Sequence, residues 1–228
     1  MTNVDLNVSP YRDPRYVERK LEVERRADGS ILLRNPHPLR AIPSNPIEPI
    51  RKWAAEAPDR IWLGKRKPVK EGFGDWDLLT YAESSAKVNA IAQALLDRGL
   101  DESKPVMILS GNSIEHALMT YGAILAGVPA APVSPSYSTM SSDFEKLRYV
   151  FDLVEPKLIF MQEGAPFERA LKALDLDGVE LVTVDGSFGT PFASLTQTTP
   201  GNDVEESYAR LNFDMVAKYL FTSGSTGM

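Results

Sequence analysis

The sequence predicts an α/β fold in which a largely parallel sheet is flanked by helices. From residue 80 onward, short apolar strands alternate with segments of helical periodicity, which is the order that a parallel sheet requires. Helix start and stop signals separate the strands: a Thr-Tyr-Ala-Glu capping box begins at Thr80, and Gly99 and Gly127 follow helical stripes. The 228 residues are 43% hydrophobic and 25% charged, which is enough apolar content for a sizeable core.

Residues 1–45 are predicted to form an N-terminal arm that precedes the α/β domain. Residues 1–20 are charged and show no periodicity. In "LEVERRADGSILLR", residues 21–34, Asp28-Gly29 separates two strand-like runs and predicts a β-hairpin. The next stretch, "NPHPLRAIPSNPIEP", has five prolines in fifteen residues and indicates an extended connector. We therefore expect the domain proper to comprise residues 46–228.

Residues 46–228 carry the alternation of helices and strands. Apolar residues spaced 3.6 apart predict helices, and short apolar runs bounded by turn residues predict strands. The helix after Thr80 has the clearest stripe, at Val88, Ile91, Ala92, Leu95 and Leu96. Helices are predicted over residues 46–57, from Thr80 to Gly99, from Asn112 or Ser113 to Gly127, and over 142–154 and 165–174. Strands are predicted over residues 61–65, 76–79, 106–109, 128–133, 158–161, 179–184 and 218–221.

Two segments of this domain give weaker signals. The strand at residues 128–133 contains Pro129 and Pro132, and because proline lacks an N–H this strand is expected at an edge or at a strand end. The polar stretch before residue 218 is rich in Thr, Ser and Gly and carries no predicted element.

Composition excludes several functional classes. The net charge is −6 and the pI is near 5.1, which disfavours a general nucleic-acid binder. The chain has no cysteine, so disulfides, thiolate metal sites and a cysteine nucleophile are excluded. The N-terminus lacks the apolar core of a secretory signal, and the most apolar segment, residues 123–133, is too short to span a bilayer. We therefore expect a cytoplasmic protein without a transmembrane segment or a protein-held metal.

The last residues, "YLFTSGSTGM", form the candidate ligand site. Ligands in α/β sheets bind outside the carboxyl ends of strands, and this loop directly follows an apolar run. Gly224 and Gly227 let the backbone turn sharply and approach a ligand closely. Successive N–H groups and hydroxyls suit the oxygens of a polyphosphate. The candidate phosphate-binding residues are Thr222, Ser223, Gly224, Ser225, Thr226 and Gly227.

Two other interpretations compete at this loop. Clusters of Ser, Thr and Gly are often only solvated turns. A Walker P-loop needs four residues between its glycines and a lysine after the second. Here only two residues separate Gly224 from Gly227, and Met228 stands in place of the lysine, so the Walker interpretation fails.

The loop resembles the phosphate-loop signature of adenylate-forming, AMP-binding enzymes: acyl-CoA synthetases, peptide-synthetase adenylation domains and luciferases. Three upstream segments resemble the family in the right order: "LLTYAESSAKVNAIAQALLDRGL", "VMILSGNSIEHALMTYGAILAGVPAAPVSPSYS" and "LRYVFDLVEPKLIF". The chain departs at "DESKPVMI", where many members have Gly-Asp. Two segments, "VERRADGSILLRNPHPLRAIP" and "WAAEAPDRIWLGKR", are similar more narrowly to feruloyl-CoA synthases.

This resemblance implies an ATP-dependent ligase that forms an acyl adenylate and then a coenzyme A thioester. The acid it implies is ferulate or a related hydroxycinnamate, with ATP, Mg²⁺ and coenzyme A as reactants. The six loop residues would hold the β- and γ-phosphates. A fatty acyl-CoA synthetase of the same superfamily and a non-catalytic nucleotide-binding module remain as alternatives, and the oligomeric state stays open.

The resemblance also implies that the chain is the amino-terminal part of a longer enzyme. The family's metal-binding glutamate, ribose-binding aspartate and catalytic lysine would lie after Met228. We therefore assign no catalytic residue within residues 1–228 and expect no adenylate from them alone. His116, at the start of a predicted helix, is expected to be structural.

Overall fold

The computed structural model describes residues 20–39 and 41–222, and the chain divides into two units, residues 1–42 and 43–228. The first unit holds an antiparallel hairpin of β1 (Glu22–Arg25) and β2 (Ile31–Arg34). At its turn Gly29 adopts a φ of 83°, and the Gly29 N–H donates to the Arg26 carbonyl over 3.0 Å. The hairpin predicted around Asp28-Gly29 is confirmed.

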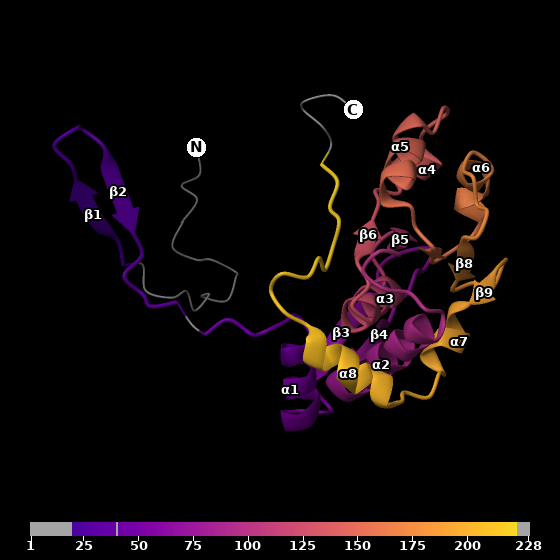
Figure 1. Ribbon diagram of the computed structural model, residues 1–228, viewed down its shortest axis with the longest axis horizontal. Helices are drawn as coiled ribbons and strands as arrows, with labels where there is room; N and C mark the ends of the chain where they lie inside the picture. Colours follow the sequence, from indigo (N-terminus) through magenta and orange to yellow (C-terminus); the bar gives the residue numbers. More distant parts are fainter. Residues whose placement is uncertain (1–19, 40, 223–228) are drawn as a thin grey trace, which may run out of the picture. The chain divides into compact units, whose positions relative to one another are not determined.

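The second unit is built on a five-stranded sheet in which every pair of strands is parallel. Its strand order is β6-β5-β7-β8-β9 (Figure 1). The α/β class with a largely parallel sheet is therefore confirmed. The strands are β5 (Val106–Leu109), β6 (Ala130–Pro132), β7 (Leu158–Met161), β8 (Glu180–Thr183) and β9 (Thr190–Pro191).

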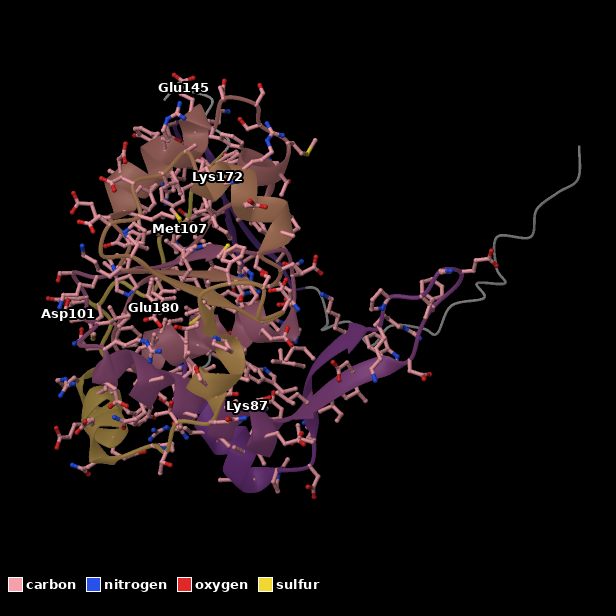
Figure 2. All side chains as sticks on the ribbon, turned by 90° about the vertical axis from the view of Figure 1, so that its right-hand side faces the viewer. Lys87, Asp101, Met107, Glu145, Lys172 and Glu180 are labelled. Carbon is pink, nitrogen blue, oxygen red and sulfur yellow. The ribbon has the colours of Figure 1, made fainter. Side chains whose placement is uncertain are left out.

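Helices cover both faces of this sheet. Alternate residues of β5 and β7 point to opposite faces, so Ile108 and Phe160 enter one core while Met107 and Ile159 enter the other. Met107 lies inside the unit, whereas Lys87 and Glu145 lie on its outside (Figure 2). The first core is covered by α1 (Glu48–Glu56), α2 (Tyr81–Asp97) and α3 (Ile114–Leu125), and the second by α5 (Glu145–Val154) and α6 (Glu168–Leu171).

A separate two-stranded sheet packs beside the first core. It pairs β3 (Ile61–Arg66) with β4 (Trp76–Thr80) in antiparallel register. Trp62 on β3 stacks on Tyr81 of α2 at a centroid distance of 5.8 Å and meets Tyr121 of α3 edge-on at 5.2 Å. This aromatic cluster fixes α2 and α3 against the small sheet.

The predicted helix caps form as expected. The Thr80 hydroxyl accepts from the Glu83 N–H at 3.2 Å, and the Glu83 carboxylate accepts from the Thr80 N–H at 2.9 Å. Of the two candidates before α3, Ser113 is the cap, and its hydroxyl accepts from the His116 N–H at 2.9 Å. Each cap satisfies N–H groups that have no partner within the helix.

The strand predicted at residues 218–221 is wrong. Only Lys218 forms a bridge, to Ala130, with the Ala130 N–H donating to Ala217 and the Tyr219 N–H donating to Ala130. The next rung of a parallel ladder would need an N–H from Pro132, which has none. The ladder between β6 and the segment at Lys218 therefore stops after one rung. β6 is the edge strand of the five-stranded sheet, as its prolines predicted.

The polar stretch with no predicted element contains β9, α7 (Phe192–Thr196) and α8 (Asn202–Arg210). Polar anchors hold α8 in place. The Gln93 side-chain carbonyl accepts from the Gly201 N–H at 2.8 Å, and the buried Ser207 hydroxyl donates to the Leu125 carbonyl at 2.8 Å. Arg51 of α1 forms a two-pronged ion pair with Glu205 at 2.7 and 2.8 Å.

Three smaller differences concern helix bounds. A short helix, α4 (Ser136–Thr139), follows β6 where none was predicted. The helix predicted over residues 142–154 begins at Glu145, because Phe144 adopts a left-handed φ of 56°. The helix predicted over residues 165–174 divides into a 3₁₀ turn, η1 (Ala165–Phe167), and α6. In residues 20–39 and 41–222, no helix combines the length and apolar character needed to cross a bilayer.

Candidate functional site

The carboxyl edge of the parallel sheet contains a topological switch point between β5 and β7. From β5 the chain runs through α3 to β6 on one side, and then passes β5 to reach β7 on the other. The loops after β5 and β7 therefore leave the sheet in opposite directions and open a crevice between them, where α/β proteins bind ligands.

A cavity of about 200 Å³ occupies this place. Small-molecule pockets generally measure about 300–1,000 Å³, so this cavity suits one polar group and is too small for a whole nucleotide. Its lining comes from the loops after β5 and β7, from β3 and from η1: Lys65, Ser110, Gly111, Asn112, Gln162, Glu163, Pro166 and Phe167.

Hydrogen bonds order the cavity wall. The Ser110 hydroxyl donates to the Gly111 carbonyl at 2.8 Å, and the Gln162 side-chain amide donates to the Glu115 carboxylate at 3.1 Å. The other end of that amide, Gln162 Oε1, is buried and has no partner in the described part of the chain. Gln162 and Ser110 were not among the candidate residues. Their signal is their position, because each directly follows an apolar strand.

His116 stands beside this wall, with its Nδ1 3.2 Å from the Gly111 carbonyl oxygen. Burial disfavours the imidazolium and lowers the pKa of His116 below its ordinary value, and the Lys218 cation acts in the same direction. The hydrogen bond to Gly111 opposes the shift. Through this contact the histidine touches the turn between β5 and α3, and its structural role stays a prediction.

This depressed pKa predicts a pH dependence of stability. Below about pH 6.5 the unfolded chain takes up a proton at His116 while the folded state resists it. Above about pH 6.5 the neutral His116 therefore costs the folded state no stability. The free energy of unfolding decreases as the pH falls from there toward the folded-state pKa. In urea unfolding between pH 7 and pH 5, His116→Gln should show a smaller loss of unfolding free energy than the wild type. Equal losses in both proteins would contradict this.

The predicted phosphate loop lies almost entirely outside the described residues. Thr222 is described and is exposed, whereas Ser223, Gly224, Ser225, Thr226 and Gly227 fall beyond the described part. The segment leading to it is placed at the β6 edge by hydrogen bonds of 3.1 Å (Ala130 N–H to Ala217) and 3.0 Å (Tyr219 N–H to Ala130). Phe221 packs against the second core. In Figure 1 this segment continues from α8 past the β6 side of the sheet.

No group of three or more His, Cys, Asp or Glu side chains within residues 20–39 and 41–222 is arranged to hold a metal ion.

The parallel sheet of the second unit belongs to the class of α/β folds that bind ligands in the loops at the carboxyl edge of the sheet. Within that class, the chain belongs to the AMP-binding enzyme family, whose model, described as "AMP-binding enzyme", matches residues 50–228. The family is that of adenylate-forming enzymes, so the resemblance noted in the sequence is confirmed at this level. Feruloyl-CoA synthase, the narrower resemblance, is not indicated by the relatives.

Curated relatives include peptide synthetases and fatty-acid ligases. The chain is 29% identical over 153 residues to a mycosubtilin synthase polypeptide of Bacillus subtilis, covering 65% of this chain and 5% of that protein. It is 27% identical over 162 residues to the long-chain-fatty-acid–CoA ligase FadD15 of Mycobacterium tuberculosis, covering 68% of this chain and 26% of that ligase. The chain thus spans a small part of the length of these relatives.

Solved structures support the fold. A fatty acyl-adenylate ligase from L. pneumophila, solved with acyl adenylate and pyrophosphate, superimposes with a TM-score of 0.57 at 17% identity, covering 80% of this chain and 29% of that one. The N-terminal domain of FACL13 from Mycobacterium tuberculosis gives 0.52 at 20% identity, covering 69% and 37%. The fold therefore matches the N-terminal domain of adenylate-forming enzymes.

Proposed function

We propose that this chain carries the triphosphate-binding part of an ATP-dependent acid–thiol ligase. The observation that carries the proposal is the loop "TSGSTG", which comes directly after a segment hydrogen-bonded to the edge of a parallel sheet. Membership of the AMP-binding family supports the use of ATP. The six residues from Thr222 to Gly227 are the proposed contacts to the β- and γ-phosphates.

The proposed reaction has two steps. A carboxylate oxygen attacks the α-phosphorus of ATP, the bond to the bridging oxygen breaks, and pyrophosphate leaves with its electron pair. The thiol of coenzyme A then attacks the acyl carbon and AMP leaves. ATP enters as its magnesium complex. Because the first step needs alignment and charge neutralisation above all, donors that hold the departing pyrophosphate lower its barrier.

The proposed acid is ferulate or a related hydroxycinnamate. This rests on the two segments that resemble feruloyl-CoA synthases, residues 23–43 and 53–66. The relatives named above include a long-chain-fatty-acid–CoA ligase, which supports a fatty acid as the runner-up, beside a peptide synthetase polypeptide. A binding module without catalysis is the remaining alternative.

Acid-dependent exchange of labelled pyrophosphate into ATP, measured on the protein that contains this chain, tests the proposal. We expect exchange with ferulate and little with palmitate or amino acids. Exchange with palmitate alone would transfer the assignment to fatty-acid ligases. No exchange with any acid, despite ATP binding measured by calorimetry, would favour the binding module and overturn the proposed catalysis.

A further inference from the structure

The hairpin of the first unit has one apolar face. In an antiparallel pair, directly opposite residues share a face, and so do alternate residues along a strand. Val23 lies opposite Leu33, and Arg25 lies opposite Ile31. We call the side chains of Leu21, Val23, Ile31 and Leu33 the apolar face; each is between 51% and 63% exposed, and Arg25 borders them on the same side at the turn end.

The other face of the hairpin is charged. It presents Glu22, Glu24 and Arg34 together with Leu32, and Glu24 and Arg34 form an ion pair at 3.4 Å. Further strands beside such a hairpin would place more apolar side chains next to its apolar face. Two strands alone are marginally stable in water, and a stable sheet with a hydrophobic face needs at least about three.

The two edges of the hairpin differ in what they offer to another strand. The Arg26 N–H donates to the Ser30 carbonyl at 2.9 Å, and hydrogen-bonded pairs alternate along the ladder. The backbone groups of Ile31 and Leu33 therefore point away from β1, to the edge of β2 that pairs with no other strand of the described residues. Charged side chains protect an edge strand from pairing, and they occupy most of β1 but only the last position of β2.

We propose that β2 pairs with β2 of a second copy of this chain, antiparallel about a two-fold axis at Leu32. In this register Ile31 of each copy lies opposite Leu33 of the other, which are the residues whose backbone groups point outward. Leu32 lies opposite Leu32 of the second copy, and Ser30 of each copy lies opposite Arg34 of the other. No two like charges face each other.

This register also joins the two apolar faces. Because the axis is perpendicular to the sheet, both copies turn Val23, Ile31 and Leu33 to the same side of a four-stranded sheet. A two-fold contact closes on itself, whereas pairing β2 with β1 would leave free edges and propagate. Pairing β1 with β1 about Glu24 would set two carboxylates opposite each other. The inference does not depend on the proposed ligase activity.

Two double variants of the full chain test the register. In Ile31→Lys/Leu33→Lys, lysines face lysines across the proposed axis; in Ile31→Lys/Leu33→Glu, every lysine faces a glutamate. Both variants remove the same apolar side chains. By sedimentation equilibrium we expect a dimer for the wild type, and a dissociation constant at least about tenfold higher for the Lys/Lys variant than for the Lys/Glu variant. Added salt should reduce the difference between the dissociation constants of these two variants, because it screens the charges.

Three outcomes would overturn the proposal. The wild type could sediment as a monomer at all concentrations, which would mean that another part of the same chain or another protein covers the hairpin. The two double variants could dissociate equally, which would exclude the 31–33 pairing. Finally, Val23→Lys, on the apolar face but away from the new strand pair, could weaken the dimer as much as the Lys/Lys variant does.

Discussion

Replacing Ser223 or Thr226 by alanine is expected to lower acid-dependent pyrophosphate exchange by about 10²–10³-fold. Each hydroxyl is a proposed donor to phosphate oxygens whose charge grows as pyrophosphate leaves, and the loss of one such donor costs about 3 kcal/mol in the transition state. The loss should appear mainly in the maximal rate, because the donors act more strongly on the transition state than on bound ATP.

Thr199→Ala is the matched control for these loop variants. Thr199 is an exposed hydroxyl residue in the polar connection between α7 and α8. Its substitution should leave the exchange rate within about twofold of the wild type. Loop variants that behave like Thr199→Ala would mean that "TSGSTG" is a solvated turn, and the phosphate assignment would fail.

Gly122→Ala is expected to destabilise the second unit by about 1 kcal/mol, which is the overpacking cost less the gain in helix propensity. Gly122 lies where α3 crosses α2, and a Cβ there would come within 2.7 Å of the Ile91 Cβ and closer still to Ile91 Cγ2. Alanine favours a helix interior over glycine by about 1 kcal/mol, but overpacking a closed core costs about 1–3 kcal/mol, and here Cβ meets a rigid branched side chain. The clash should dominate.

Urea unfolding followed by tryptophan fluorescence measures this effect, because Trp62 contacts both Tyr81 of α2 and Tyr121 of α3. Gly111→Ala serves as the control: a Cβ at Gly111 meets no atom within 4 Å, and its φ is not in the left-handed region. The control should lie within about 0.5 kcal/mol of the wild type. If Gly122→Ala and Gly111→Ala had the same free energy of unfolding, the close approach of α2 and α3 would not restrict the size of the side chain at position 122.

Elements with strong local signals were predictable from the sequence. The hairpin turn at Gly29, the box at Thr80 and the cap at Ser113 form as expected, because each satisfies the backbone through nearby residues. The strands β5 and β7 are short apolar runs buried on both faces, as central parallel strands must be.

Elements that depend on distant partners were not predictable. The helix α8 has Val204 and Ser207 as its buried residues, so it carries few of the apolar side chains that mark a helix in sequence. It is held instead by Gln93 and Arg51, more than a hundred residues away in sequence. The failure at residues 218–221 has a similar cause, because the strand signal there was local while its neighbour's Pro132 set the limit.

The site divides in the same way. A phosphate site at Ser223 to Gly227 was predicted from its residue types alone, and it stays a prediction because these residues lie outside the described part of the chain. The cavity between β5 and β7 was not predictable, because Gln162 and Ser110 become neighbours of one pocket only through the strand order. Strand order follows from tertiary packing, which a single sequence does not display.

The single rung between Ala130 and the segment at Lys218 has a consequence for motion. Segments held by few backbone hydrogen bonds and few buried contacts open at a small fraction of the free energy of global unfolding. With Pro132 unable to extend the ladder, the amide of Tyr219 makes the last main-chain hydrogen bond of this segment within the described residues. Beyond Tyr219 the side chain of Phe221, packed against the second core, also holds the lead into the loop. Losing this one backbone rung and this one apolar contact would release the segment up to Thr222 while β6 and the rest of the sheet stay intact.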